Sequence, residues 1–170
     1  LYRSKRIRAI GISNFRPRHM EELSRTAEIA PMVNQIRLCP GDTQDEVVEY
    51  CRTHNILLEA YSPLGVGKIF EVPEMKALAE KYQKSIAQIC IRWSLQRGYL
   101  PLPKSVTPSR IKENTQVFDF ELEAADVQLI DHIVLRAVLH IAQLEQIRTQ
   151  RVVFTVIGKA LLLSLIHISE

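Results

Sequence analysis

Short apolar runs alternate with longer amphipathic stretches over the first 133 residues, and this pattern predicts four strand–helix units. Near-continuous apolar runs, typical of strands that are buried on both faces, predict strands at 7–13, 32–36, 56–61 and 99–103. Amphipathic stretches predict helices at 17–28, 43–54, 73–82, 85–97 and 123–133, with a short helix after Thr107. Strands that alternate with helices indicate a parallel sheet of the α/β class.

Residues at the predicted helix starts agree with this assignment. Pro17 and Pro73 stand where a first helical residue is expected, because proline lacks only an N–H that is unpaired there anyway. A hydroxyl residue followed three positions later by Glu or Gln predicts a capping box, and two such pairs occur: Thr43 with Glu46, and Ser85 with Gln88.

Polar and aromatic residues stand at the carboxyl ends of the predicted strands. Ser13-Asn14 ends the first strand, Gln35 lies near the end of the second, and Tyr61-Ser62 ends the third. In a parallel (β/α) barrel the active site collects at this end of the strands. Simpler interpretations stay open, because Asn14 could merely end a strand and Tyr61 could be a core residue. Gln35 in an apolar strand is harder to dismiss, since a buried amide needs hydrogen-bond partners.

The segment after the fourth strand carries two cations and two hydroxyls on either side of a predicted helix start. Lys104 ends the strand, Ser105 and Thr107 lie in the turn, and Arg110 follows in the first helical turn. A helix N-terminus with added cations suits a doubly charged phosphate. The alternative is an ordinary capped helix with solvated charges.

These four segments, in this order and spacing, resemble the C-terminal half of the aldo-keto reductase family, over about residues 5 to 133. The resemblance implies an eight-stranded (β/α)8 TIM barrel of which this chain holds roughly the last four βα units. It also implies an oxidoreductase that uses NADP(H) to reduce a small-molecule carbonyl substrate. No G-x-G-x-x-G motif occurs, so the Rossmann route to a dinucleotide is not indicated.

The resemblance implies cofactor contacts at matching positions. Ser13, Asn14 and Gln35 would hydrogen-bond the nicotinamide carboxamide, whose donors and acceptor suit hydroxyl and amide partners. Tyr61 would stack on the nicotinamide ring. Ser62 and Leu64 would lie beside the pyrophosphate.

The adenosine end of the cofactor would be bound by the segment after the fourth strand. The resemblance implies a clamp on the 2′-phosphate made by Lys104, Ser105, Thr107 and Arg110, and Val106 belongs to the same cofactor-binding segment. Glu113 and Asn114 would lie near the adenine.

The catalytic residues of the family, a Tyr acid with Lys, Asp and His, belong to the first half of the barrel and have no match here. We therefore assign no catalytic residue and expect this chain alone to be inactive. Glu59 alternates to the same side of its strand as Tyr61. It could be an acid or base, but a buried carboxylate paired with a nearby cation is favoured.

The length of the chain agrees with half a barrel, because 170 residues cannot supply the roughly 250 that eight βα units need. We expect residues 1–133 to be the half-barrel and 134–170 to be a tail of unclear origin, artefactual or frameshifted, because the resemblance stops there. The start at Leu1, without Met, fits a gene fragment. One alternative is a non-catalytic half-barrel that binds a nucleotide or assembles with another half. A weaker one is a membrane tether at 152–168, which Lys159 argues against.

Composition and charge change this picture little. A net charge of +3 and a pI near 8.8 do not indicate nucleic-acid binding. Cys39, Cys51 and Cys90 have no metal-ligand spacing and are expected to be free thiols, and no metal site is assigned. No secretory signal appears, so a cytoplasmic location is expected. Unpaired edges of a half-barrel predict self-association.

Overall fold

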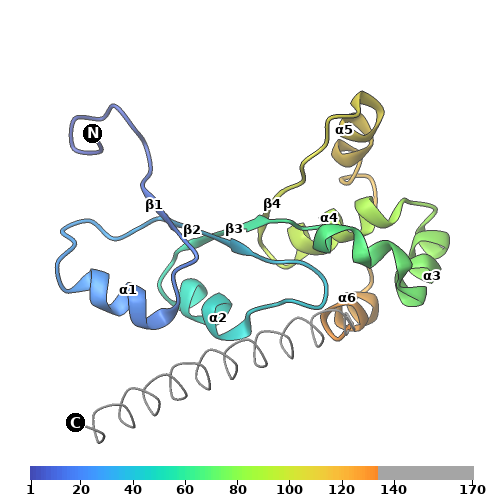
Figure 1. The fold of residues 1–170 in the computed structure, drawn as a ribbon, viewed down its shortest axis with the longest axis horizontal. Coiled ribbons are helices and arrows are strands. Elements are labelled where there is room, and N and C mark those ends of the chain that lie inside the picture. The colour runs from blue at the N-terminus through green and yellow to red at the C-terminus, as the bar shows by residue number, and fades with distance from the viewer. Residues whose placement is uncertain (134–170) are drawn as a thin grey trace, which may run out of the picture. The chain divides into compact units, whose positions relative to one another are not determined.

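The computed structural model describes residues 1–133, which form a parallel four-stranded sheet and its connecting helices (Figure 1). The strands lie side by side in chain order and are β1 (Gly11–Ser13), β2 (Val33–Arg37), β3 (Leu57–Tyr61) and β4 (Leu100–Leu102). The first helices are α1 (Pro17–Ser24) and α2 (Asp45–Thr53), and β3 leads into a 3-10 segment, η1 (Gly65–Glu71). The later helices are α3 (Pro73–Tyr82), α4 (Ile86–Gln96), α5 (Pro108–Thr115) and α6 (Ala124–Asp131). This arrangement confirms the α/β prediction and its four units.

The strand register places three polar residues in one row across the sheet. Ser13 is opposite Gln35, which is opposite Glu59 in turn. Gly11 explains how β1 comes so near β2, since a Cβ at this position would lie 3.0 Å from the carbonyl oxygen of Val33. A side chain at this position would crowd β2, so glycine suits the close approach of the two strands.

Burial alternates along the strands, which corrects the expectation that both sheet faces are covered. Asn34, Ile36, Leu58 and Ala60 are buried on the face that packs against helices. The opposite face, called here the open face, carries strand residues at the alternate positions, and Leu57, Leu100 and Leu102 on it are 43–47% exposed. Within residues 1–133 no layer covers this face. Apolar side chains for which the sequence pattern predicts burial are therefore exposed.

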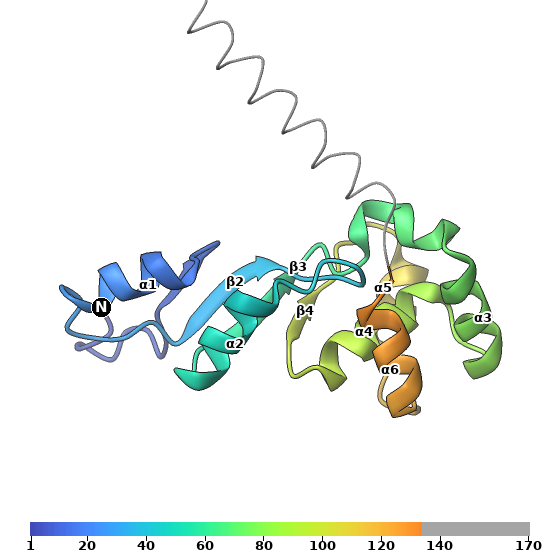
Figure 2. The same ribbon diagram turned by 90° about the horizontal axis from the view of Figure 1, so that it is seen from below.

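The helices that cover the buried face bring distant parts of the chain together (Figures 1 and 2). Helix α2 packs on β3 and against α1, whereas α4 packs on β4 and against α3 and α5. Trp93 on α4 is fully buried, its Nε1 donates to Asp131 Oδ1 at 2.9 Å, and its ring meets Tyr99 edge-on. These contacts join α6 to the strand layer through α4.

The capping predictions have mixed outcomes. The Ser85–Gln88 box is confirmed, because the Ser85 Oγ accepts from the Gln88 N–H and the Gln88 side chain accepts from the Ser85 N–H. The Thr43 box is wrong. Helix α2 begins after Gln44, which adopts a left-handed conformation at the N-cap and donates its side-chain amide to the carbonyl of Arg37. The N-cap therefore lies one residue beyond Thr43.

Helix α1 is shorter than the predicted 17–28 and ends at Ser24. The Ser24 hydroxyl donates to the Glu21 carbonyl at 2.7 Å, and the Thr26 hydroxyl donates to the Leu23 carbonyl. Hydroxyl side chains that take backbone acceptors in this way favour the end of a helix.

The predicted tail at 134–170, including the apolar stretch at 152–168, lies outside the described residues. Within residues 1–133, no helix has both the length and the apolar character needed to cross a membrane. The same part of the chain contains no group of three or more His, Cys, Asp or Glu side chains that could hold a metal ion. The three cysteines are free and buried, as expected.

Candidate functional site

A chain of hydrogen bonds joins four predicted site residues at the carboxyl ends of β1, β2 and β3. The Tyr61 hydroxyl donates to Asn14 Oδ1 at 3.2 Å, and Asn14 Nδ2 donates to Ser13 Oγ at 3.2 Å. Ser13 Oγ in turn donates to the backbone carbonyl of Gln35 at 3.2 Å. Tyr61, on the third strand, is thus held beside the amide and hydroxyl groups at the end of the first.

The backbone turns sharply at the same strand ends. Asn14 has φ of 57° and Ser62 has φ of 51°, both in the left-handed region. Asn adopts this conformation more readily than most residues, whereas Ser does so at greater cost. Each residue directly follows a strand, so the rigid sheet extends to Ser13 and Tyr61 and the chain leaves it within one residue. Such strain is concentrated at functional sites in proteins generally.

Asn34 supports the first of these turns from beneath the sheet, and sequence reasoning did not identify it. Its side chain is fully buried. Asn34 Nδ2 donates to the Phe15 carbonyl at 2.9 Å, and Asn34 Oδ1 accepts from the Phe15 N–H at 3.4 Å. These two bonds hold the Phe15 backbone in the way that hydrogen bonds from a neighbouring strand would. An Asn in an apolar strand was the available signal, because a buried amide requires such partners.

Gln35 and Glu59 face each other on the open face, which corrects two expectations. Gln35 is half-buried rather than buried, and the fully buried amide of this strand is that of Asn34. The predicted cation partner of Glu59 is absent from the described part of the chain. Instead, Gln35 Nε2 donates to Glu59 Oε2 at 2.6 Å. Register explains this pairing, because directly opposite residues on parallel strands project to the same face.

Arg37 adds an unexpected charge next to Tyr61. The two residues are opposite in the register of β2 and β3, and Arg37 Nε lies 3.4 Å from Asp42 Oδ2. Burial raises the pKa of Asp42, against the opposing effect of the Arg37 charge. Burial likewise raises the pKa of the nearby Cys39 thiol. A buried thiol with a raised pKa is a poor nucleophile, so we interpret Cys39 as structural.

The loop after β3 turns back on itself through backbone hydrogen bonds. The Gly65 N–H donates to the Ser62 carbonyl, and the Gly67 N–H donates to the Leu64 carbonyl, each at 3.0 Å. Val66 between them has φ of 56°, which is unusual for a β-branched residue. Ser62 and Leu64 are both half-buried in this turn. Their side chains are therefore held by a compact loop next to Tyr61.

The predicted phosphate-binding segment follows β4, and β4 pairs with β3. The segment therefore begins at the same carboxyl end of the sheet as Tyr61. Lys104, Val106, Thr107 and Arg110 are exposed, and Ser105 Oγ accepts from the Thr107 N–H at 3.2 Å. A hollow of about 320 Å³ next to them is lined by Pro103, Ser105, Ile111, Asn114 and Thr115.

The donors of this segment fit a phosphate group. Within residues 1–133, neither Lys104 nor Arg110 forms an ion pair with a carboxylate. Thr107 occupies the N-cap of α5 as predicted, but in the same part of the chain its hydroxyl makes no capping bond. Two cations and one hydroxyl are therefore available to an anion. Glu113 and Asn114 lie further along α5, and the Glu113 carbonyl accepts from Gln88 Nε2 at 3.3 Å.

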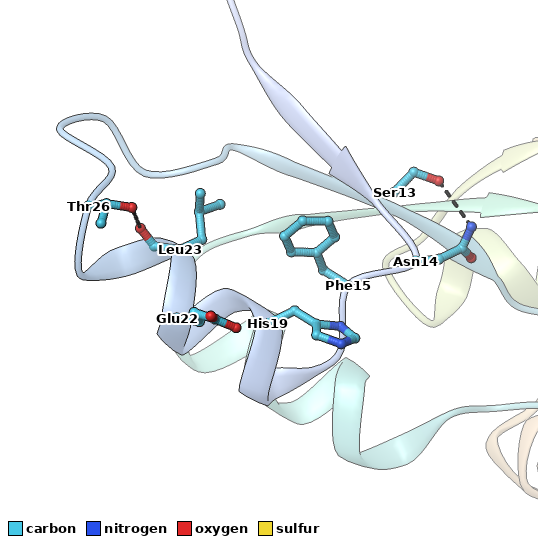
Figure 3. A pocket seen from close by; sticks show the side chains of 7 residues that line it. All are labelled: Ser13, Asn14, Phe15, His19, Glu22, Leu23 and Thr26. Atoms are coloured by element: carbon cyan, nitrogen blue, oxygen red, sulfur yellow. Dashed lines mark hydrogen bonds between the residues drawn. The ribbon is translucent and has the colours of Figure 1, made fainter.

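A larger hollow, of about 530 Å³, lies between the end of β1 and α1 (Figure 3). Figure 3 shows the Asn14 amide turned toward the Ser13 hydroxyl at one side of this hollow. Next to them the rings of Phe15 and His19 meet edge-on, and Leu23 and Thr26 lie at the far side. The hollow touches the predicted site only through Ser13 and Asn14, since its other walls belong to α1 and the residues beside it.

Comparison with known proteins places the chain and its fold in one family. A sequence profile of the Aldo/keto reductase family matches residues 1–135. Glyoxal reductase of Bacillus subtilis is 48% identical over 131 residues, which are 77% of this chain and 48% of that protein.

Solved structures agree. An aldo-keto reductase, MGS-M4, from a deep-sea metagenome library has a TM-score of 0.76 at 38% identity, covering 79% of this chain and 51% of its own. A Bombyx mori aldo-keto reductase in complex with NADP has a TM-score of 0.69 at 35% identity, covering 76% of this chain and 46% of its own.

The chain spans about half the length of the relatives it matches. The similar structures are (β/α)8 barrels, so the prediction of a partial barrel is confirmed. With a profile match over most of the sequence, a sequence relative at 48% identity and a fold shared at 35–38% identity, this chain belongs to the aldo/keto reductase family.

Proposed function

We propose that the chain is the cofactor-binding half of an NADP(H)-dependent aldo-keto reductase. The observation that carries the proposal is the hydrogen-bonded group of Tyr61, Asn14 and Ser13 at the carboxyl end of the sheet. It combines an aromatic ring with amide and hydroxyl groups, as a nicotinamide ring and its carboxamide require. The NADP complex of the Bombyx mori relative supports the choice of cofactor.

The nicotinamide end would be held on the open face of the sheet. Ser13, Asn14 and Gln35 would hydrogen-bond the carboxamide, and Tyr61 would stack against the ring. The bond from the Tyr61 hydroxyl to Asn14 limits how far the tyrosine ring can turn. A fixed ring would determine which face of the nicotinamide meets the substrate.

The phosphate groups would lie along the loops that follow β3 and β4. Ser62 and Leu64 would flank the pyrophosphate, while Glu113 and Asn114 would approach the adenine. The 2′-phosphate would be bound by the segment that combines exposed cations with hydroxyl and backbone donors: Lys104, Ser105, Val106, Thr107 and Arg110. Cations that lack a carboxylate partner among the described residues would bind a phosphate without first breaking an ion pair.

The reaction would be the reduction of a small carbonyl compound to an alcohol, for which the bound cofactor supplies a hydride. The chain's own residues would bind and orient the cofactor. We assign none of them as the acid that protonates the carbonyl oxygen, so the chain alone is proposed to bind cofactor without turnover.

The phosphate assignment is tested by Arg110→Ala. A hydrogen bond to a charged group contributes about 1.5–3 kcal/mol, so NADPH affinity should fall about tenfold or more, while NADH affinity barely changes. Both affinities can be measured by calorimetric titration of the 170-residue chain.

Lys112→Ala is the matched control, because Lys112 is an exposed cation on the same helix that the proposal leaves unassigned. It should leave the NADPH affinity nearly unchanged. Equal losses for NADPH and NADH in the Arg110 variant would show that Arg110 is structural and would refute the clamp.

A second candidate, a half-barrel that assembles with another half, is favoured by one observation. The open face exposes Leu57, Leu100 and Leu102, and apolar surface of this kind is usual at protein interfaces. Cofactor binding and assembly can be tested separately, because Leu57, Leu100 and Leu102 have no assigned role in cofactor binding. The association experiment described in the Discussion tests this candidate.

A further inference from the structure

We infer that Glu59 is a positioning residue that fixes the orientation of the Gln35 amide, so that its carbonyl oxygen Oε1 is the atom presented to the cofactor carboxamide. This inference rests on the proposed function, because it assigns Gln35 the role of carboxamide partner. It adds a reason why a carboxylate, rather than another polar group, stands next to that amide.

The geometry gives Glu59 one clear partner. Glu59 Oε2 accepts from Gln35 Nε2 at 2.6 Å, a short distance typical of a charge-assisted hydrogen bond. The two residues are opposite in register and both are half-buried on the open face. Salt bridges to Glu59 are absent within residues 1–133, so the carboxylate interacts with the amide rather than with a cation.

The chemistry of the pair removes an ambiguity that an amide otherwise has. A glutamine can turn its amide over and exchange donor for acceptor at little steric cost. An ionised carboxylate only accepts, so it selects the orientation in which Nε2 faces it. Gln35 Oε1 is then left to accept from another donor, and it accepts from none within the described chain.

That orientation matches the carboxamide of a nicotinamide, whose –NH2 group donates. With Oε1 presented, Gln35 accepts from this group. With the amide reversed, two –NH2 groups would oppose each other and the bond would be lost. Glu59 therefore acts on cofactor binding through Gln35, without needing to touch the cofactor.

The experiment uses Glu59→Gln in the 170-residue chain. This variant keeps the size of the side chain and its ability to hydrogen-bond, but it both donates and accepts, so the Gln35 amide is no longer held in one orientation. NADPH affinity should fall about twofold or more, because only the fraction of chains that present Oε1 is ready to bind the carboxamide. The affinity for 2′,5′-ADP, which has the adenosine 2′-phosphate but no nicotinamide, should not change. Calorimetric titration measures both.

A double-mutant cycle separates positioning from general support of the sheet. In a Gln35→Leu background, Glu59→Gln should cause no further loss of NADPH affinity, because the residue through which Glu59 acts is gone. Glu49→Gln, at an exposed carboxylate on α2, is the matched control and should leave both affinities unchanged.

The outcomes distinguish this inference from the proposed function. Unchanged NADPH affinity in Glu59→Gln, or equal losses for NADPH and 2′,5′-ADP, would overturn the role of Glu59 while leaving the cofactor site in place. Additive losses in the cycle would also overturn it. A wild-type chain that binds neither compound would overturn the proposed cofactor site, and the inference with it.

Discussion

Asn34→Asp should lower the free energy of unfolding by an amount that depends on pH, because it replaces a buried amide with a carboxyl group. The side chain of Asn34 is fully buried and forms both a donor and an acceptor bond with the Phe15 backbone. Aspartate has the same shape, but when ionised it retains only acceptors. Its second oxygen would then face the Phe15 carbonyl, which lies 2.9 Å from the present Nδ2 atom, without a hydrogen between them.

The size and sign of the effect follow from the pKa of the new carboxyl group. An exposed Asp has a pKa of about 3.9, and full burial raises it, by up to about 3–5 units in extreme cases. Each unit of difference corresponds to about 1.4 kcal/mol, so a modest increase of about two units would cost about 3 kcal/mol at neutral pH. Because the folded-state pKa lies above the unfolded one, the loss of stability should be small below about pH 4 and should grow as the pH rises. At low pH the protonated carboxyl can again donate to Phe15.

Urea unfolding of wild type and variant near pH 5 and near pH 7 measures this difference, with both proteins at the same concentration. The free energy of unfolding of the variant should fall further below wild type at the higher pH. Asn55→Asp is the matched control, because Asn55 is exposed, so any loss of stability that it causes should be the same at both pH values. An equal loss at both pH values for Asn34→Asp would refute the reasoning, since it would mean that the new carboxylate is solvated.

Three further predictions concern activity, assembly and acid stability. The 170-residue chain should not reduce simple aldehydes with NADPH, because a positioned acid typically contributes about 10²–10⁴-fold; sustained loss of NADPH absorbance with an aldehyde present would contradict this. The chain should self-associate through its sheet edges, and a 1–133 variant should still do so; light scattering that finds a cooperatively melting 1–133 monomer would contradict this. Burial raises the pKa of Asp126, but hydrogen bonds from Lys81 and Tyr82 outweigh it and lower the pKa overall. This carboxylate therefore stabilises the fold above the ordinary pKa of Asp and loses that effect as pH falls through its lowered value. Asp126→Asn should lower the Tm at neutral pH and approach wild type near pH 2, and equal Tm values throughout would show that the contact has no net effect.

Sequence reasoning located the strands and their polar ends well, because both depend on local pattern. The strand–helix alternation, the Ser85 capping box and the position of Tyr61 at the end of β3 all follow from residues close together in the sequence. Family assignment also followed from four short segments in a fixed order. These features require no knowledge of which side chains meet across the sheet.

The partners within the site could not be predicted in the same way, because they depend on register. Gln35 was expected to be buried and Glu59 to meet a cation, yet the register places them opposite each other on the open face. Asn34 was overlooked because its partner is a backbone group 19 residues away in the sequence. The α2 cap was misplaced because Gln44 bonds to the end of β2, a contact outside the local motif.

Helix α5 has a consequence for how the two ends of the proposed site would respond to ligand. None of its residues, Pro108–Thr115, is buried, and eight residues are too few for a helix to be stable in water by itself. The groups at Tyr61, by contrast, lie on a paired strand. Ligand binding should therefore cost more conformational entropy at the adenosine end than at the nicotinamide end. Slowed backbone hydrogen exchange on binding should be concentrated in α5, and affinity should increase on cooling.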